Sequence, residues 1–219
     1  MENKLFSESP ELGYGVIGIG LVGCSVLWYN GASSMSIWAL AIIIVLILIA
    51  LLYFYRNPYI DPSVTYKDSC VIAPSYGTVS TIIRDLIRNT VTICIFLSPL
   101  DIHQQYYPIN GTVTSRVYDA TGKFELAYEM DKSRDNEKKI HTLATAYGPV
   151  IVTQIAGWAV RSIVSDESVG VPVTAGHRFG MIKFGSRVDL VLPFEDKLML
   201  HVEVGDKLTG GSQIIGCYT

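Results

Sequence analysis

An uncharged apolar segment near the start of the chain sets the strongest limit on how this protein can fold. Residues 35–55, MSIWALAIIIVLILIALLYFY, contain no Asp, Glu, Lys or Arg. A helix needs about 20 apolar residues to cross the hydrocarbon core of a bilayer, so this segment predicts a transmembrane helix. The apolar share of the whole chain, 49%, is also high for a protein that lies entirely in water.

A second uncharged segment, residues 13–29, precedes the first and is rich in glycine. Small residues favour close packing of helices in a membrane. A signal peptide is the alternative, but Glu2, Glu8 and Glu11 and the lack of a basic leader oppose it. Residues 30–34, NGASS, form only a turn. Residues 1–56 are therefore expected to be a membrane anchor built as a helical hairpin.

Two basic residues suggest how this hairpin is oriented. Lys4 lies before the first helix and Arg56 directly follows the second, whereas the connecting turn carries no charge. The positive-inside rule then places both ends of the hairpin in the cytoplasm. We expect a protein of the cell (inner) membrane whose soluble domain lies on the cytoplasmic side.

The remaining residues, 57–219, are expected to form one soluble domain that is mostly β and largely antiparallel. Short β-branched or apolar runs alternate with turn residues such as Asn110-Gly111 and Gly205-Asp206. Only residues 142–146 and the region around 131–139 could hold helical turns, and the latter is most simply a solvated loop. The runs expected to be strands are 78–83, 91–97, 112–117, 150–155, 188–192, 198–202 and 213–217.

Charge and cysteine content exclude several classes of function. A net charge of −3 without a basic tract argues against nucleic acid as a partner. Cys24, Cys70, Cys94 and Cys217 show no metal-binding spacing, so no metal site is expected. These cysteines suit a reducing compartment and are interpreted as small buried apolar residues.

The Gly185-Ser186 pair carries the most distinctive chemistry in the chain. Such a pair is usually structural, but here it lies between two apolar runs, with Arg178, Lys183 and Arg187 close in sequence. In a strained turn the Ser186 hydroxyl can attack the Gly185 carbonyl, because glycine has no side chain to block it. The resulting ester can eliminate to a dehydroalanine, which hydrolyses to a pyruvoyl group at the new amino terminus.

Asp101 and His103 are the second candidate pair. They are two residues apart, so an extended strand would project both side chains to one face. An aspartate beside a histidine can orient a base, although such a pair taken alone is more often part of a surface turn. The other histidines are His141, His177 and His201, and the residues alone leave the identity of a processing base open.

The segment RFGMIKFGSRVDLVLP, residues 178–193, resembles the processing segment of the short pyruvoyl-dependent phosphatidylserine decarboxylases, including archaetidylserine decarboxylase-like members. Further segments match in family order and, together, cover nearly everything after Tyr53. They are FYRNP at 54–58, IFLSPLDIHQQYYPINGTV at 95–113, DNEK at 135–138 and QIAGWAVRSIV at 154–164.

The resemblance implies a specific enzyme. The chain would cleave itself between Gly185 and Ser186 into residues 1–185 and 186–219, and Ser186 would become the pyruvoyl cofactor. Phosphatidylserine would form a Schiff base with that group and leave as phosphatidylethanolamine and CO2, with Asp101 and His103 as acid-base groups. The implied partners are the phospholipid substrate, the membrane, the cleaved small chain and a homo-oligomer.

Two departures from the family pattern keep a different function open. Residues 74–77 are PSYG where the family usually has PADG, and His177 stands where short members commonly carry an acidic residue. These differences allow an alternative, an unprocessed membrane-anchored binding or scaffold protein that keeps the fold without activity.

Two other features suggest architecture. Residues 72–82 and 202–216 resemble the two halves of a hammerhead or lipoyl-like β module, without the carrier lysine of a lipoyl domain. Tyr106, Tyr107 and Trp158 are candidates for an aromatic rim at the membrane interface, and core packing is the alternative for these large side chains.

Overall fold

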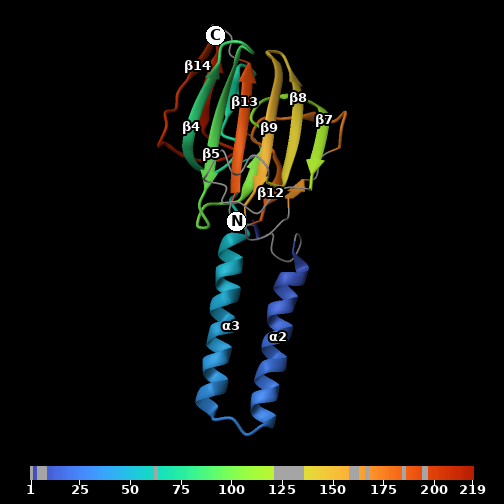
Figure 1. Ribbon diagram of the computed structural model, residues 1–219, viewed down its shortest axis with the longest axis vertical. Helices are drawn as coiled ribbons and strands as arrows, with labels where there is room; N and C mark the ends of the chain where they lie inside the picture. The colour runs from blue at the N-terminus through green and yellow to red at the C-terminus, as the bar shows by residue number, and fades with distance from the viewer. Residues whose placement is uncertain are drawn as a thin grey trace. The chain divides into compact units, whose positions relative to one another are not determined.

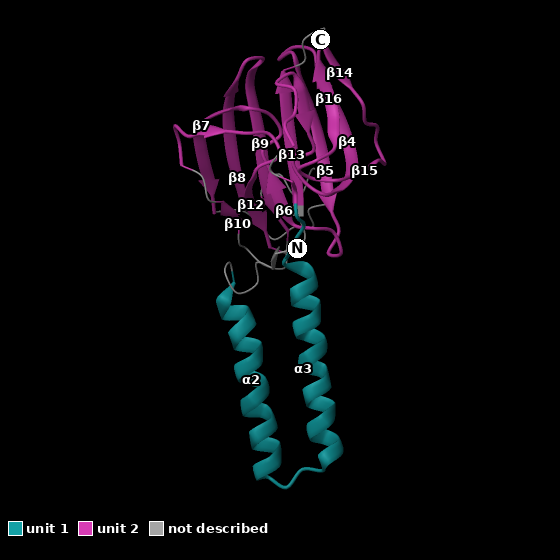
Figure 2. Ribbon diagram, turned by 180° about the vertical axis from the view of Figure 1, so that it is seen from behind, with its two compact units in different colours: residues 1–59 teal, residues 60–219 magenta. Residues whose placement is uncertain are grey.

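The structure is a computed structural model that describes residues 2–3, 9–61, 64–120, 136–157, 163–165, 168–183, 186–193 and 197–219. It divides into two compact units, residues 1–59 and residues 60–219 (Figure 2). Each unit is described by itself.

The first unit contains the two apolar helices, α2 (Pro10–Tyr29) and α3 (Ser34–Phe54) (Figure 1). Both are long and apolar enough to cross a membrane by length and composition. Helix α2 begins earlier than the glycine-rich segment suggested, because Pro10 fits the first turn of a helix, where its missing N–H is not needed. Two short strands, β1 (Glu2–Asn3) and β2 (Arg56–Asn57), pair beyond the helices.

Glycines on α2 allow the two helices of the hairpin to pack closely. A Cβ atom added at Gly20 would lie 2.7 Å from Ile44 Cδ1, and one at Gly23 would lie 3.1 Å from Leu40 Cδ2. At the end of the hairpin away from the connecting turn, the hydroxyls of Ser9 and Tyr55 lie 2.7 Å apart and form a hydrogen bond. The predicted helical hairpin is confirmed.

The second unit is built from antiparallel strands, which confirms the predicted fold class. The strands are β3 (Cys70–Ile72), β4 (Gly77–Asp85), β5 (Thr90–Leu97), β6 (Gln104–Tyr106), β7 (Gly111–Asp119), β8 (Lys138–Thr145), β9 (Gly148–Ala156), β10 (Ile163–Ser165), β11 (Pro172–Val173), β12 (Arg178–Ile182), β13 (Ser186–Pro193), β14 (Leu198–Leu200), β15 (Lys207–Leu208) and β16 (Ile214–Tyr218).

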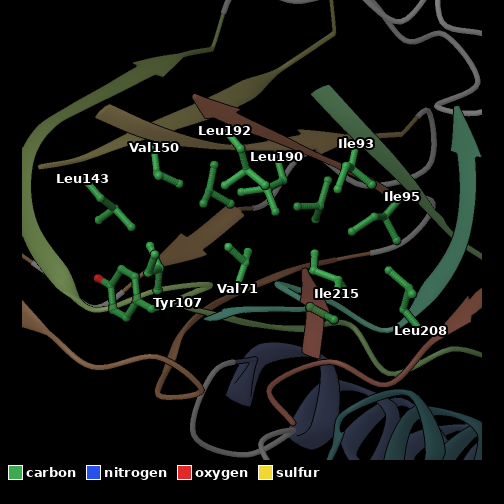
Figure 3. Packing of buried hydrophobic residues seen from close by; sticks show 14 of the residues in the cluster. Val71, Ile93, Ile95, Tyr107, Leu143, Val150, Leu190, Leu192, Leu208 and Ile215 are labelled. Atoms are coloured by element: carbon green, nitrogen blue, oxygen red, sulfur yellow. The ribbon is translucent and has the colours of Figure 1, made fainter. Parts of the chain in front are cut away.

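The largest sheet has eight strands in the order β11-β7-β8-β9-β13-β5-β4-β15. Alternate residues of its central strands are fully buried, among them Ile93 and Ile95 on β5 and Leu190 and Leu192 on β13. These side chains face Val71 and Ile215 of the opposing strands in one core (Figure 3). The period of two residues explains why these runs could be recognised as strands from the sequence.

Two three-stranded sheets, β14-β16-β3 and β10-β12-β6, accompany the large one. Strand β16 pairs with β3, and β15 pairs with β4, so the two segments that resemble a lipoyl-like module do pack on each other. The turn at Gly205-Asp206 is part of this arrangement, because the N–H of Gly205 donates to the Val79 carbonyl at 2.8 Å.

Two expectations from the sequence are wrong. Residues 142–146 are not helical, since most of them belong to β8, which pairs with both β7 and β9. Two neighbouring strands supply more pairing than one turn of helix, so tertiary structure decides here.

The second wrong expectation concerns the cysteines. Cys70 on β3 and Cys217 on β16 are direct partners across the two strands and form a disulfide. Cys94 is a buried free thiol, as expected, and Cys24 is a free thiol on α2. The pairing of Cys70 and Cys217 required knowledge that the two ends of the β unit meet, which their sequence separation of 147 residues conceals.

Candidate active site

Ser186 is the first residue of β13, the strand that lies between β5 and β9 near the middle of the eight-stranded sheet. Its Cα partners are Leu97 on β5 and Ala156 on β9. Gly185 lies outside the described residues. The structure therefore places Ser186 at the start of a central strand, whose backbone pairs with a strand on each side.

The neighbour of Ser186 on β9 is itself fixed by the residues before β8. The N–H of Ala156 donates to the Glu137 carbonyl at 2.9 Å, and Asn136 Nδ2 donates to the Ala156 carbonyl at 2.9 Å. Both backbone groups of Ala156 therefore form hydrogen bonds with residues 136–137 and not with β13. In an antiparallel ladder, the backbone N–H and C=O of its partner Ser186 then point to the other side, toward Leu97.

Glu137, whose backbone carbonyl accepts from Ala156, has a buried side chain that is 2% exposed. It accepts a hydrogen bond from the Tyr118 hydroxyl at 2.5 Å. A buried carboxylate needs such a partner, because burial of an unpaired charge is costly. The DNEK segment carries part of the family resemblance, but the sequence alone indicates no role for Asn136 or Glu137.

Asp101 lies in a tight turn and not in a strand, so the expectation that Asp101 and His103 share a strand face is wrong. The Asp101 N–H donates to the Ser98 carbonyl at 2.9 Å, and Asp101 Oδ2 accepts from the Ser98 N–H at 2.8 Å. Ser98 directly follows Leu97, the partner of Ser186 on β5. Pro99 favours this turn, because its ring fixes the backbone.

His103 is fully buried at the start of the segment that leads into β6. Its Nδ1 lies 2.9 Å from the Asp101 backbone carbonyl. A carbonyl can only accept, so Nδ1 carries the proton in this contact and Nε2 is the nitrogen that takes up a second one. Asp101 and His103 are therefore linked through the Asp101 backbone.

The backbone of His103 meets the strand that leads to Ser186. The N–H of Ile182, the last residue of β12, donates to the His103 carbonyl at 3.3 Å. Only residues 183–185 separate Ile182 from Ser186. The segment 97–103 thus contacts the polypeptide before the candidate bond, where the His103 carbonyl accepts from Ile182, and after it, where Leu97 pairs with Ser186.

The other histidines differ in their surroundings. His141 on β8 is 1% exposed and packs edge-on against Phe179, with the ring centroids 4.9 Å apart. Burial lowers the pKa of His141 to about 4, against the opposing effect of its hydrogen bond with Gln154. His141 is therefore neutral near pH 7. His177 and His201 are exposed. The surroundings of these three histidines do not identify the processing base.

The basic residues around Ser186 bind to neighbouring side chains. Arg178 Nε donates to Gln104 Oε1 at 2.5 Å. Arg187 is 4% exposed, and its Nη2 donates to Asp189 Oδ2 at 3.0 Å. Arg187 and Asp189 alternate along β13 with the core residues Val188 and Leu190, so this ion pair lies on the other face of the strand. Burial and the Asp189 carboxylate raise the pKa of nearby Cys94 to about 12.

The sequence left an interfacial rim and core packing open for three aromatic residues, and core packing is correct for two of them. Tyr106 and Tyr107 are each 1% exposed and belong to the core of the β unit. Tyr107 packs against Phe179 with ring centroids 4.7 Å apart. Trp158 lies outside the described residues.

The departure PSYG is accommodated inside the fold. Ser75 is fully buried and forms a bridge with Gln105 on β6. The ring of Tyr76 lies edge-on to that of Tyr106, with centroids 6.4 Å apart. The segment thus supports β6, next to the candidate site.

Sequence reasoning also missed two buried glutamines, Gln105 and Gln154, which are 0% exposed. Gln154 begins the QIAG segment, and Gln105 is part of the segment that contains His103. Their amides connect β8 and β9 to the His103 backbone. For Gln154, an amide in a largely apolar strand segment was the available signal, whereas Gln105 lies among polar and aromatic residues and carries no such signal. Across the described ranges, no three His, Cys, Asp or Glu side chains gather in a way that could hold a metal.

These features define a class of protein: an antiparallel β unit joined to an apolar helical hairpin, with a serine that follows a glycine in the sequence at the start of a central strand. The chain belongs to the phosphatidylserine decarboxylase family, because the family model of that description matches residues 51–216.

Curated relatives agree with this membership. The chain is 37% identical over 184 residues to a phosphatidylserine decarboxylase proenzyme of Chlorobaculum parvum, which covers 81% of this chain and 83% of that protein. Proenzymes of the same name from Chlorobaculum tepidum and Saccharopolyspora erythraea are 38% and 36% identical, over 75% and 74% of this chain and 76% and 71% of those proteins.

Proposed function

We propose that this protein is a phosphatidylserine decarboxylase that makes its own pyruvoyl cofactor by cleaving the bond between Gly185 and Ser186. The observation that carries the proposal is the position of Ser186 at the entrance to β13, beside the turn of Asp101 and the buried His103, in a chain of this family. No observation favours the alternative of an unprocessed scaffold.

The surroundings of Ser186 fit a cofactor made from the chain. The new amino terminus stays in place after cleavage, because β13 pairs with β5 and β9 along its length and Arg187 is tied to Asp189. The pyruvoyl group supplies a carbonyl that captures the substrate amine and accepts the electron pair released as CO2 departs. The small chain 186–219 is therefore a lasting partner of the large chain.

His103 and Asp101 have separate tasks in this proposal. His103 holds a proton on Nδ1 toward the Asp101 carbonyl, so its Nε2 is the atom that takes up a second proton from solvent. The imidazolium then passes this proton to the substrate α carbon in place of the lost carboxylate. Asp101, through its carboxylate on the Ser98 N–H, holds the turn beside Ser186 during self-cleavage. Phosphatidylserine thereby becomes phosphatidylethanolamine and CO2.

The test of self-cleavage is an intact-mass measurement on purified full-length protein under reducing, denaturing conditions, which separate chains that a disulfide would join. Wild type should give two chains, 1–185 and 186–219, and the small chain should have a blocked amino terminus. Ser186→Ala should give one chain, because the attacking hydroxyl is gone. Cleavage of Ser186→Ala at the same bond would refute the mechanism, and an uncut wild type would favour the scaffold.

We further propose that the helical hairpin anchors the enzyme in the membrane that holds its phospholipid substrate, with both ends on the cytoplasmic side. Lys4 and Arg56 flank the uncharged turn and support this orientation. The Cys70–Cys217 disulfide favours the opposite side, since disulfides are rare in the cytosol. A homo-oligomer rests on the family resemblance alone, and light scattering of the detergent-solubilised protein would test it.

Cysteine labelling decides the orientation. Ser33 lies in the turn between α2 and α3, so Ser33→Cys should react with an impermeant maleimide added outside intact cells. His201→Cys, at an exposed position of the β unit, should react only after lysis. Protection of Ser33→Cys together with labelling of a cysteine placed at the exposed position His201 would reverse the orientation.

A further inference from the structure

A chain of buried amide hydrogen bonds runs from β8, across β9 and β6, to the backbone of His103. His141 Nε2 lies 2.9 Å from Gln154 Oε1, and Gln154 Nε2 donates to Gln105 Oε1 at 2.9 Å. Gln105 Nε2 in turn donates to the His103 carbonyl at 2.8 Å. The four residues are at most 1% exposed, so water does not compete for these bonds.

The donors and acceptors in this series of hydrogen bonds can be arranged in only one way. The His103 carbonyl can only accept, so Gln105 must turn its NH2 group toward it and its oxygen toward Gln154. Gln154 must then donate to that oxygen, which leaves its own oxygen facing His141. His141 therefore carries its proton on Nε2. Burial, which lowers the pKa of His141 to about 4, is consistent with a neutral ring.

The end point of the chain is the carbonyl that also receives the Ile182 N–H at 3.3 Å. The amides thus act on the place where β12 passes His103, shortly before Ser186. Gly180 on β12 gives the Gln154 amide space, because a Cβ atom added at Gly180 would lie 3.1 Å from Gln154 Nε2.

Two glutamine amides inside an apolar core are costly unless every polar group is paired. Leu or Met at these positions would fill similar space without that requirement. Gln105 and Gln154 satisfy each other and end on the residue to which the proposed function gives the proton transfer. This arrangement distinguishes them from Gln104, an equally buried neighbour whose amide binds Arg178 and Met181.

We infer that Gln105, Gln154 and His141 are positioning residues, which hold the His103 backbone so that its imidazole meets the reacting centre. They touch neither substrate nor cofactor. The inference rests on the proposed function of His103 and adds the residues through which the rest of the sheet sets its position.

The test compares Gln105→Met, Gln154→Met and the double variant with Gln104→Met, all in the full-length protein in detergent. Methionine keeps the length of the side chain and removes the amide. Gln105→Met, Gln154→Met and the double variant should each lower kcat of the cleaved enzyme about 10- to 100-fold. KM should be nearly unchanged, as expected for a small displacement of a catalytic group. Gln104→Met should leave kcat within about threefold of wild type.

The double variant separates positioning from general support of the core. One broken link already interrupts the chain, so Gln105→Met with Gln154→Met should cost no more than either single change, whereas independent structural effects would add. Nitrogen NMR of protein labelled at histidine should show the Nε2-H form of His141 in wild type and in Gln104→Met, and a shifted Nε2 signal in Gln154→Met. Melting temperatures identify any variant that fails to fold.

Additive losses of kcat, an equal loss in Gln104→Met, or a His141 proton on Nδ1 in wild type would each overturn the inference while the proposed function stands. A wild-type protein that neither cleaves nor releases CO2 would overturn the proposed function, and the positioning role with it. If the singles misfold, Gln154→Glu keeps the acceptor for His141 but removes the donor to Gln105. It should lower kcat to the same extent, and unchanged kcat would again refute the inference.

Discussion

At the scale of single residues, the candidate site shows how a backbone contact assigns a task to a side chain. The Asp101 carbonyl fixes the proton of His103 on Nδ1, while the Asp101 carboxylate turns back to the Ser98 N–H. The two residues therefore do not form a carboxylate–imidazole pair in this structure. A sequence that places Asp and His two apart is compatible with both arrangements.

This separation predicts different outcomes for the two residues. His103→Ala should lower decarboxylation of the cleaved enzyme about 100- to 10,000-fold, the usual contribution of a general acid or base. Asp101→Ala should leave the precursor uncut, because the turn beside Ser186 loses its internal hydrogen bond. The mass of the chains shows whether self-cleavage has occurred, and CO2 release measures decarboxylation.

Asp101→Asn provides the matched control. The asparagine oxygen can still accept from the Ser98 N–H, so self-cleavage should continue if the turn is what matters, and should stop if the charge is needed. Normal cleavage and turnover in Asp101→Ala, or a loss below roughly threefold in His103→Ala, would remove the residue concerned from the site.

At the scale of elements, β12 is the strand on which the site depends most directly. It pairs with β10 on one side and β6 on the other, and Gly180 is a partner in both pairs. A Cβ atom added at Gly180 would lie 2.3 Å from the Val164 carbonyl oxygen. No rotamer relieves this contact, because both atoms are fixed to backbones.

Gly180→Ala should therefore destabilise the β unit. Overpacking of this kind costs about 1–3 kcal/mol, which lowers the melting temperature of a domain of this size by roughly 2–4 °C per kcal/mol. The measurement is thermal unfolding of uncut Ser186→Ala protein with and without the change. Gly15→Ala on α2, where nothing lies within 4 Å of the new methyl group, should leave this transition unmoved. An unchanged melting temperature for Gly180→Ala would show that β10 can shift away freely.

The same elements show what the sequence could predict. Strands such as β5 and β13 alternate buried and less buried residues on a regular period, and the helices carry a long uncharged run, so both follow from local pattern. Strand β8 did not, because its identity comes from two neighbouring strands. The turn at Asp101 was missed because a spacing of two residues fits a strand as well as a turn.

At the scale of the whole chain, the ends of the β unit meet at positions that the cleavage bond separates. Cys70 on β3 precedes the candidate bond and Cys217 on β16 follows it. Ser186 could be picked out from its local motif as the candidate cleavage residue. The contact between Cys70 and Cys217 could not be predicted, since 147 residues separate the two cysteines.

The disulfide predicts that self-cleavage leaves a covalently joined enzyme. Wild-type protein, with free thiols blocked at lysis, should migrate as one species without reductant and as two chains with it. Blocking in denaturant, which exposes the buried Cys94, should modify Cys24 and Cys94 only. Cys217→Ser should separate into two chains on denaturation without reductant. Strand pairing, of β13 with β5 and β9, β15 with β4 and β16 with β3, is then the remaining link, and denaturation removes it.

Cys94→Ser is the control, and its chains should stay joined, since Cys94 is buried away from the disulfide and burial raises the pKa of its thiol to about 12. The result also bears on orientation. A joined wild type extracted with its thiols blocked requires an oxidising compartment around the β unit, whereas four modified cysteines would return Cys70 and Cys217 to the thiol state that the sequence suggested. In that case the two chains would be held only by the sheet, and the cytoplasmic orientation indicated by Lys4 and Arg56 would face no opposing observation.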